Sequence, residues 1–174
     1  RSLEFLRRVE EHLDALTVPA HRRAVIAYAI YARSLFGDHD VARARALLKE
    51  AGGPEEAGLE LLGFLLPTLE TGSDEAELRA IERHLTNRIT ETASAANFVE
   101  RYEDAAKVVF SSSRRTDGLL LESLIRTERL SDLAPKLVRG LLSHRSRGDH
   151  LSTQENVFIL LALEAYFREH EGVA

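Results

Sequence analysis

The sequence contains no cysteine, methionine or tryptophan, and only four prolines. Without cysteine the chain forms no disulfide, thiolate nucleophile, zinc finger or iron–sulfur cluster, and cysteine usage cannot reveal its redox compartment. No apolar run approaches the roughly 20 residues that a membrane-spanning helix needs, and no signal-peptide pattern opens the chain. Because the chain begins at Arg1 and lacks methionine, we expect it to be an excised fragment.

The composition is that of a folded, soluble protein. Of the 174 residues, 44% are hydrophobic and 29% are charged, which is far from the polar composition of a disordered chain. This length is typical of one domain or part of one. The formal net charge of −5 argues against a general nucleic-acid-binding protein, because such domains carry a marked basic excess.

Apolar residues recur at three- and four-residue steps along most of the sequence, which predicts helices. Four predicted helices carry one apolar stripe among charged residues: 2–16, 40–51, 74–87 and 133–145. Four others are apolar nearly all round: 19–36, 55–66, 116–126 and 152–167. Pro67 should kink or stop the 55–66 helix, and Thr116 or Asp117 should cap the 116–126 helix.

The two kinds of helix alternate along the chain. A striped helix has one face to bury, whereas a helix that is apolar all round must be covered on several sides. An inner layer of apolar helices with an outer layer of striped helices satisfies both requirements. The sequence therefore predicts an all-α fold, with residues 1–174 forming part of a single α/α toroid of about four helical hairpins.

The stretch from Ile89 to Ser113 lacks a clean helical period. Small and β-branched residues over 92–99 and the apolar run 108–110 favour a short β-hairpin inserted around 90–113 and turning near Arg101–Asp104. A short helix across 100–109 is the alternative that the same residues allow.

The polar residues give little sign of an active site. His144, Asp149 and His150 could share a metal ion, but they lie in a predicted solvated loop, and Asp38-His39-Asp40 fits a turn that ends in a helix cap. Arg147-Gly148-Asp149 is only a three-residue match to an adhesion tripeptide. No phosphate-binding, dinucleotide-binding or zinc-protease motif is present. We therefore assign no catalytic, cofactor-binding or metal-binding residue, and we expect a helical scaffold that is not an enzyme.

Three segments near the end of the chain resemble the thioester domain of bacterial proteins of the α2-macroglobulin and complement family. They are Arg115–Leu124 (RTDGLLLESL), Pro135–Leu142 (PKLVRGLL) and Leu151–Leu163 (LSTQENVFILLAL). The segment Asn87–Ala93 (NRITETA) resembles the connection that precedes them in the bacterial members. Within the last segment, Ser152, Thr153 and Gln154 match the family's motif at the start of a helix. Their expected roles are capping that helix and packing beside the thioester region.

The resemblance implies a broad-spectrum endopeptidase inhibitor of the periplasm or cell envelope, in which this chain is a part of the α/α toroid. Proteins of that family trap proteases: cleavage of a bait region triggers a rearrangement, and a Cys–Gln thioester acylates the attacker. The partners implied are other domains of the parent chain and target proteases, with no nucleic acid, membrane span or cofactor. This chain departs from the pattern because it has no cysteine. Gln154 is not a thioester glutamine, since residue 151 is leucine.

Two alternatives remain open at the level of the sequence. One is a helical-repeat protein-binding module unrelated to protease trapping. The other is a toroid enzyme acting on an apolar substrate, which the low aromatic content of 6% disfavours. Apolar helices at the open ends of an arc would expose surface that promotes association. We therefore predict that the isolated chain is a dimer or a tightened, partly collapsed solenoid.

Overall fold

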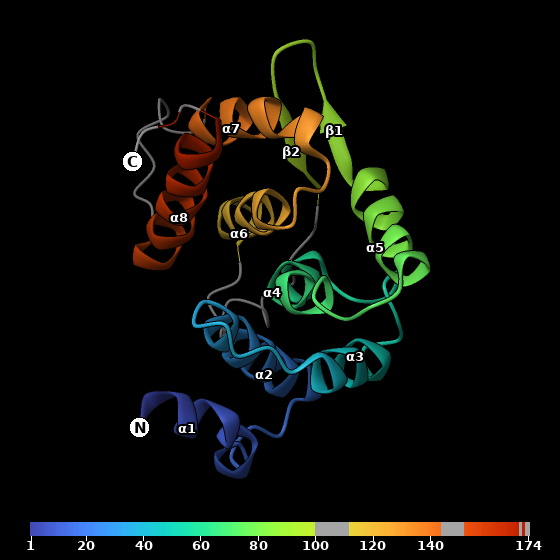
Figure 1. Cartoon of the computed structure of the whole chain (residues 1–174), viewed down its shortest axis with the longest axis vertical. Coiled ribbons are helices and arrows are strands. Elements are labelled where there is room, and N and C mark those ends of the chain that lie inside the picture. Colours follow the sequence, from blue (N-terminus) through green and yellow to red (C-terminus); the bar gives the residue numbers. More distant parts are fainter. Residues whose placement is uncertain (100–111, 144–151, 171, 173–174) are drawn as a thin grey trace. The chain divides into compact units, whose positions relative to one another are not determined.

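The computed structural model describes residues 1–99, 112–143, 152–170 and 172. Within these residues it contains eight α-helices, short 3-10 helices and one two-stranded sheet (Figure 1). The all-α fold class is therefore confirmed. The chain divides into two compact units, Arg1–Ile81 and Glu82–Ala174. The toroid and its extent over 1–174 stay predictions.

The first unit is organised around α4. Its elements are α1 (Ser2–Arg7), the 3-10 helix η1 (Val9–His12), α2 (Pro19–Ser34), α3 (Val41–Glu50), α4 (Leu59–Leu69) and the first half of α5 (Glu75–Asn87). Nearly every residue of α4 is buried, and both α2 and α3 pack against it (Figure 1). The rings of Tyr28 and Tyr31 lie 5.6 and 5.5 Å from the ring of Phe64, so aromatic contacts join α2 to α4.

Ion pairs join the remaining elements of this unit. Arg33 at the end of α2 bonds to Asp38 at 3.0 Å and to Asp40 at 3.4 Å, and Arg43 on α3 bonds to Glu10 and Glu50 at 2.6 and 2.7 Å. The hydrogen bond from Arg33 holds the pKa of Asp38 below its usual value. These bonds tie η1, α2 and α3 together.

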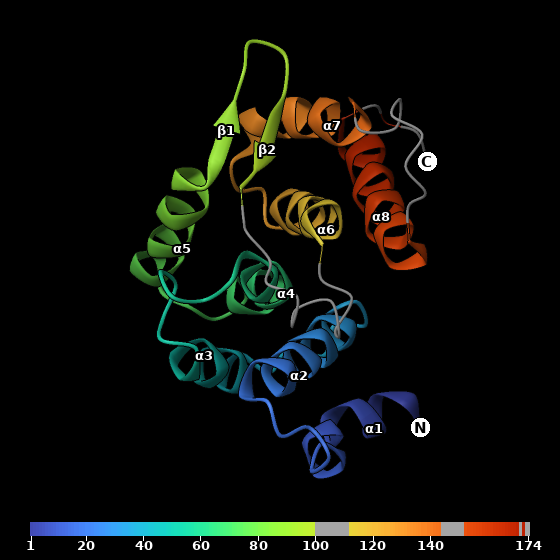
Figure 2. The same cartoon turned by 180° about the vertical axis from the view of Figure 1, so that it is seen from behind.

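The second unit is organised around α6. Its elements after α5 are β1 (Ile89–Glu91), β2 (Ala96–Phe98), α6 (Ser113–Arg126), the 3-10 helix η3 (Ser131–Leu133), α7 (Ala134–Ser143) and α8 (Thr153–His170). The strands pair antiparallel, with Ile89 opposite Phe98 and Glu91 opposite Ala96. All residues of α6 from Arg115 to Ile125 are buried. The elements α7, α8 and β2 all contact α6 (Figures 1 and 2).

A β-hairpin lies in the predicted region, but it pairs residues 89–91 with 96–98, so residues 92–95 form a turn where the sequence predicted a strand. The chain reverses over residues 92–95, where the Thr92 side chain accepts a hydrogen bond from the Ala95 amide at 3.0 Å. A threonine hydroxyl that bonds to the nearby backbone competes with strand pairing, and the small residues that follow it allow a tight turn. The predicted turn at 101–104, the predicted strand at 108–110 and the alternative helix at 100–109 lie outside the described residues.

Several helix ends also differ from prediction. The predicted helix 2–16 is divided into α1 and η1, and α4 begins at Leu59 rather than residue 55. Pro67 does not stop α4, which continues to Leu69. Neither Thr116 nor Asp117 caps α6. Ser112 does so, because its hydroxyl accepts a hydrogen bond from the Arg115 amide, and this places both predicted caps inside the helix.

Candidate functional site at the junction of α6 and α8

The helices α6 and α8 approach each other closely at Gly118. A methyl group on Gly118 would lie 2.9 Å from the carbonyl carbon of Phe158 and 3.0 Å from the amide nitrogen of Ile159. Those are backbone atoms of α8, which no side-chain rotation can move away. Because glycine has no side chain, the backbone of α6 at Gly118 can pack directly against the backbone of α8.

A pair of serines and one glutamate link the beginnings of the two helices. The Ser112 hydroxyl donates to the Glu155 carboxylate at 2.7 Å. The Ser152 amide donates to the other oxygen of Glu155 at 2.7 Å, and the Glu155 amide donates to the Ser152 hydroxyl at 3.2 Å. The latter two bonds form the reciprocal capping box that the Ser152–Glu155 spacing predicts. Glu155 therefore joins α6 to α8 while capping α8.

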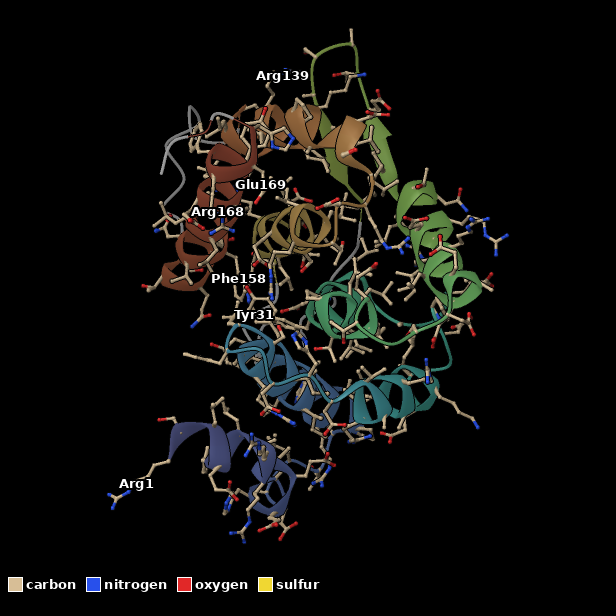
Figure 3. The ribbon with its side chains drawn as sticks, viewed as in Figure 1. Arg1, Tyr31, Arg139, Phe158, Arg168 and Glu169 are labelled. Atoms are coloured by element: carbon tan, nitrogen blue, oxygen red, sulfur yellow. The ribbon has the colours of Figure 1, made fainter. Side chains whose placement is uncertain are left out.

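Opposing effects set the pKa of Glu155. Partial burial raises it, but the hydrogen bonds from Ser112 and Ser152 lower it, and the net pKa lies below the usual value. The carboxylate thus stays ionised and accepts these bonds at neutral pH. One turn into α6, the guanidinium carbon of Arg115 lies 5.2 Å from the centre of the Phe158 ring on α8. Figure 3 labels Phe158 on α8, and both side chains are buried.

Asp117 is the most unusual ionisable residue of this region. Its side chain belongs to the buried part of α6 and accepts a hydrogen bond from the Phe98 amide of β2 at 3.1 Å. Burial raises the pKa of Asp117 to about 7, although the bond from Phe98 opposes this shift. The carboxyl group therefore keeps its proton to a much higher pH than an exposed aspartate does.

The motif residues Ser152, Thr153 and Gln154 lie together at the beginning of α8. Ser152 caps the helix, while Thr153 is exposed and Gln154 is half-buried in the first turn. The packing role beside a thioester region stays a prediction.

The other polar candidates from the sequence form no site in the described residues. His144, Asp149, His150 and the 147–149 tripeptide lie outside the described ranges. Asp40 caps α3, as expected, by accepting a hydrogen bond from the Arg43 amide at 3.1 Å. Across residues 1–99, 112–143 and 152–170, no three His, Asp or Glu side chains gather as metal ligands would.

A small hollow in the first unit is a further candidate for a binding site. It has a volume of about 190 Å³ and lies between η1, α2 and α3, with Arg33, Arg43, Glu10 and Asp40 in its lining. This is smaller than the roughly 300–1,000 Å³ of typical ligand pockets. Arg7 also lines the hollow, and all three arginines already bond to carboxylates, so none of these guanidinium groups is free for an anionic ligand.

Two features of the second unit go beyond what the sequence analysis located. One is the buried Asp117, for which the available signal was an acid within a helix that is otherwise rich in leucine. The other is the outer face of α8, where Val157, Leu160 and Phe167 are 44%, 65% and 39% exposed. The sequence analysis predicts exposed apolar surface on helices at the open ends of the arc, but it does not identify the side chains that carry it. None of the helices in the described ranges combines the length and apolar character needed to cross a membrane.

Within the described residues, the Ser112–Glu155 hydrogen bond and the contact of Arg115 with the Phe158 ring join α6 to α8, while Asp117 joins α6 to β2. Comparison with known proteins finds no matching family model, no matching curated protein and no matching solved structure.

Proposed function

We propose that this chain is a non-catalytic scaffold part of the thioester-type domain of a bacterial α2-macroglobulin-like endopeptidase inhibitor. The supporting observation is that the three segments that resemble this family become neighbouring helices. Arg115–Leu124 lies in α6, Pro135–Leu142 in α7 and Ser152–Leu163 at the beginning of α8, and α6 contacts both of the others.

The burial of these helices also supports the proposal. A toroid needs inner helices that are covered on several sides and outer helices that bury one face. Of the three helices, α6 is buried along its length, whereas α7 alternates buried apolar residues with the half-buried Lys136 and the exposed Arg139. This is the difference expected between an inner and an outer helix.

The absence of cysteine assigns this chain a structural task within the proposed inhibitor. It cannot supply the thiol of a thioester, so it would carry and orient other parts of the parent protein. The parent would act in the periplasm or cell envelope, and its targets would be proteases that cleave a bait region elsewhere in it.

The experiment uses the complete protein encoded by the parent gene. The purified protein is incubated with trypsin, and the remaining trypsin activity is measured on a small peptide amide and on a large protein substrate. A trap should spare hydrolysis of the peptide while strongly reducing hydrolysis of the protein, because a caged protease remains open to small molecules only. The proposal is wrong if both activities are unchanged, or if both fall together as with an active-site inhibitor.

The exposed face of α8 favours a second candidate, a helical protein-binding module unrelated to protease trapping. Exposed apolar side chains gathered on one helix are typical of interaction surfaces. The parent gene distinguishes the two candidates. A trap predicts a chain of well over a thousand residues with β-sandwich domains, as the family resemblance implies. A binding module predicts a parent without them.

A further inference from the structure

The β-hairpin is attached to the helices of the second unit through β2. Ala96 and Phe98 are buried on one face of this strand. A methyl group on Gly140 of α7 would lie only 2.1 Å from the Ala96 carbonyl oxygen and 2.6 Å from the Asn97 side chain. The hairpin therefore rests directly on α7. Arg139 adds a hydrogen bond to the Ser94 carbonyl, and Figure 3 labels this arginine on α7.

The backbone pattern of the hairpin explains why Phe98 needs a partner outside the sheet. In an antiparallel pair, bonded and non-bonded residue pairs alternate. The amides of Val99 and Thr92 bond to the carbonyls of Arg88 and Ala95. By alternation, the Ile89–Phe98 pair is non-bonded, so the Phe98 amide points away from β1. A buried amide needs an acceptor, and Asp117 supplies it at 3.1 Å.

Among the residues that the structure describes, no cation acts on the Asp117 carboxyl. The ionisable groups on the neighbouring elements are engaged elsewhere. Glu91 pairs with Lys136 across the hairpin and α7, and Glu155 of α8 bonds to the two serines. Glu122 of α6 itself pairs with Arg126, and Arg115 lies over Phe158. Among the described residues, only burial and the Phe98 amide act on the pKa of Asp117.

We propose that Asp117 is a proton-dependent latch that holds the hairpin against α6, so that the hairpin docks more firmly in acid than at neutral pH. The protonated carboxyl group still accepts the Phe98 amide through its carbonyl oxygen and carries no charge into the interior. The ionised group accepts the same bond but loses its hydration. Release of β2 from α6 returns the carboxylate to water, so ionisation favours the released hairpin.

The direction and size of the effect follow from proton linkage. The docked pKa of about 7 exceeds the ordinary value of 3.8. Docking is therefore strongest below the ordinary pKa, weakens as the pH rises, and becomes constant above the docked pKa. Between pH 5 and pH 7, the equilibrium constant for release should increase roughly 50-fold.

Two measurements on the folded chain test the latch. The first is a carbon-13 NMR titration of the Asp117 carboxyl, which should give a midpoint near 7. The second is hydrogen exchange of the Phe98 amide, expressed as protection relative to an unfolded peptide at each pH. Protection should fall by tens-fold from pH 5 to pH 7 and then stay level. In Asp117→Asn, which keeps a neutral oxygen acceptor, protection should not depend on pH.

The matched control is Asp132→Asn, which removes the same charge from an exposed position in η3 of the same unit and should keep the wild-type pH dependence. A titration midpoint near 4 would overturn the latch even if the variants failed to fold. It would also be overturned if Phe98 protection changed with pH equally in the wild type and in Asp117→Asn.

Discussion

Replacing Gly118 by alanine sets two opposing effects against each other. Alanine in the interior of a helix is usually more stable than glycine by about 1 kcal/mol, because glycine loses more backbone entropy on folding. At Gly118, however, the added methyl group would lie 2.9–3.0 Å from three backbone atoms of α8. Overpacking of this kind typically costs about 1–3 kcal/mol.

The contacts decide which effect dominates. A clash with a flexible side chain could be relieved by a change of rotamer, but the atoms facing Gly118 belong to the Phe158 and Ile159 backbone. The helices α6 and α8 must therefore separate, which loosens their shared core around Phe158 and Ala162. We expect Gly118→Ala to lower the free energy of unfolding by about 1 kcal/mol, instead of raising it by a similar amount.

Urea denaturation followed by far-ultraviolet circular dichroism measures this difference. The matched control is Ala46→Gly at an exposed position inside α3, which reports the intrinsic alanine–glycine preference in this chain and should cost about 1 kcal/mol. A second variant, Gly118→Val, should lose more stability than Gly118→Ala because its side chain is larger. If Gly118→Ala were more stable than the wild type, the close packing of α6 on α8 would be refuted.

Three further predictions concern a cap, an ion pair and a surface. Ser152→Ala should lower the free energy of unfolding by about 1 kcal/mol, whereas Ser152→Thr should largely retain stability; equal losses in urea titrations would argue against the cap. The Arg33 bond lowers the pKa of Asp38, so its stabilisation is present above the ordinary pKa and disappears as the pH falls. Asp38→Asn should cost up to about 1 kcal/mol at pH 7 and nothing at pH 2, as thermal unfolding at both pH values will show. The isolated chain should dimerise in size-exclusion chromatography with light scattering, and Leu160→Glu should shift it to monomer; a wild-type monomer at high concentration would contradict this.

The sequence predicted helices well where apolar periodicity and an end signal agree. Helix α2 begins at Pro19, α3 begins after the Asp40 cap, and α8 begins after Ser152, the first residue of the Ser152–Glu155 capping box. In each case a proline or a capping side chain marks the helix terminus at the position where the apolar pattern begins. Such a signal depends on neighbouring residues only, so it can be read without knowing the tertiary structure.

The errors arose where a distant partner decides the role of a residue. Asp117 looks like a helix cap because acids often occupy that position, but Ser112 caps α6, and the Asp117 side chain bonds to the Phe98 amide, 19 residues earlier. Gly118 and Gly140 gave no signal of their own, because their importance comes from the backbone of α8 and of β2. Periodicity shows which faces are apolar but not what covers them, so the sequence predicts exposed apolar surface at the open ends without identifying the face of α8 that carries it.

The contrast between α6 and α8 bears on the proposed function. The buried helix α6 encloses five polar side chains, namely Arg115, Thr116, Asp117, Glu122 and Ser123, while α8 leaves Val157, Leu160 and Phe167 in water. Burial of apolar surface stabilises a protein by roughly 25 cal/mol for every Å² removed from water, and the exposed side chains of α8 do not contribute this stabilisation. A self-sufficient domain gains nothing from this distribution. It suits the proposed scaffold role, in which another part of the parent protein would cover the exposed face of α8.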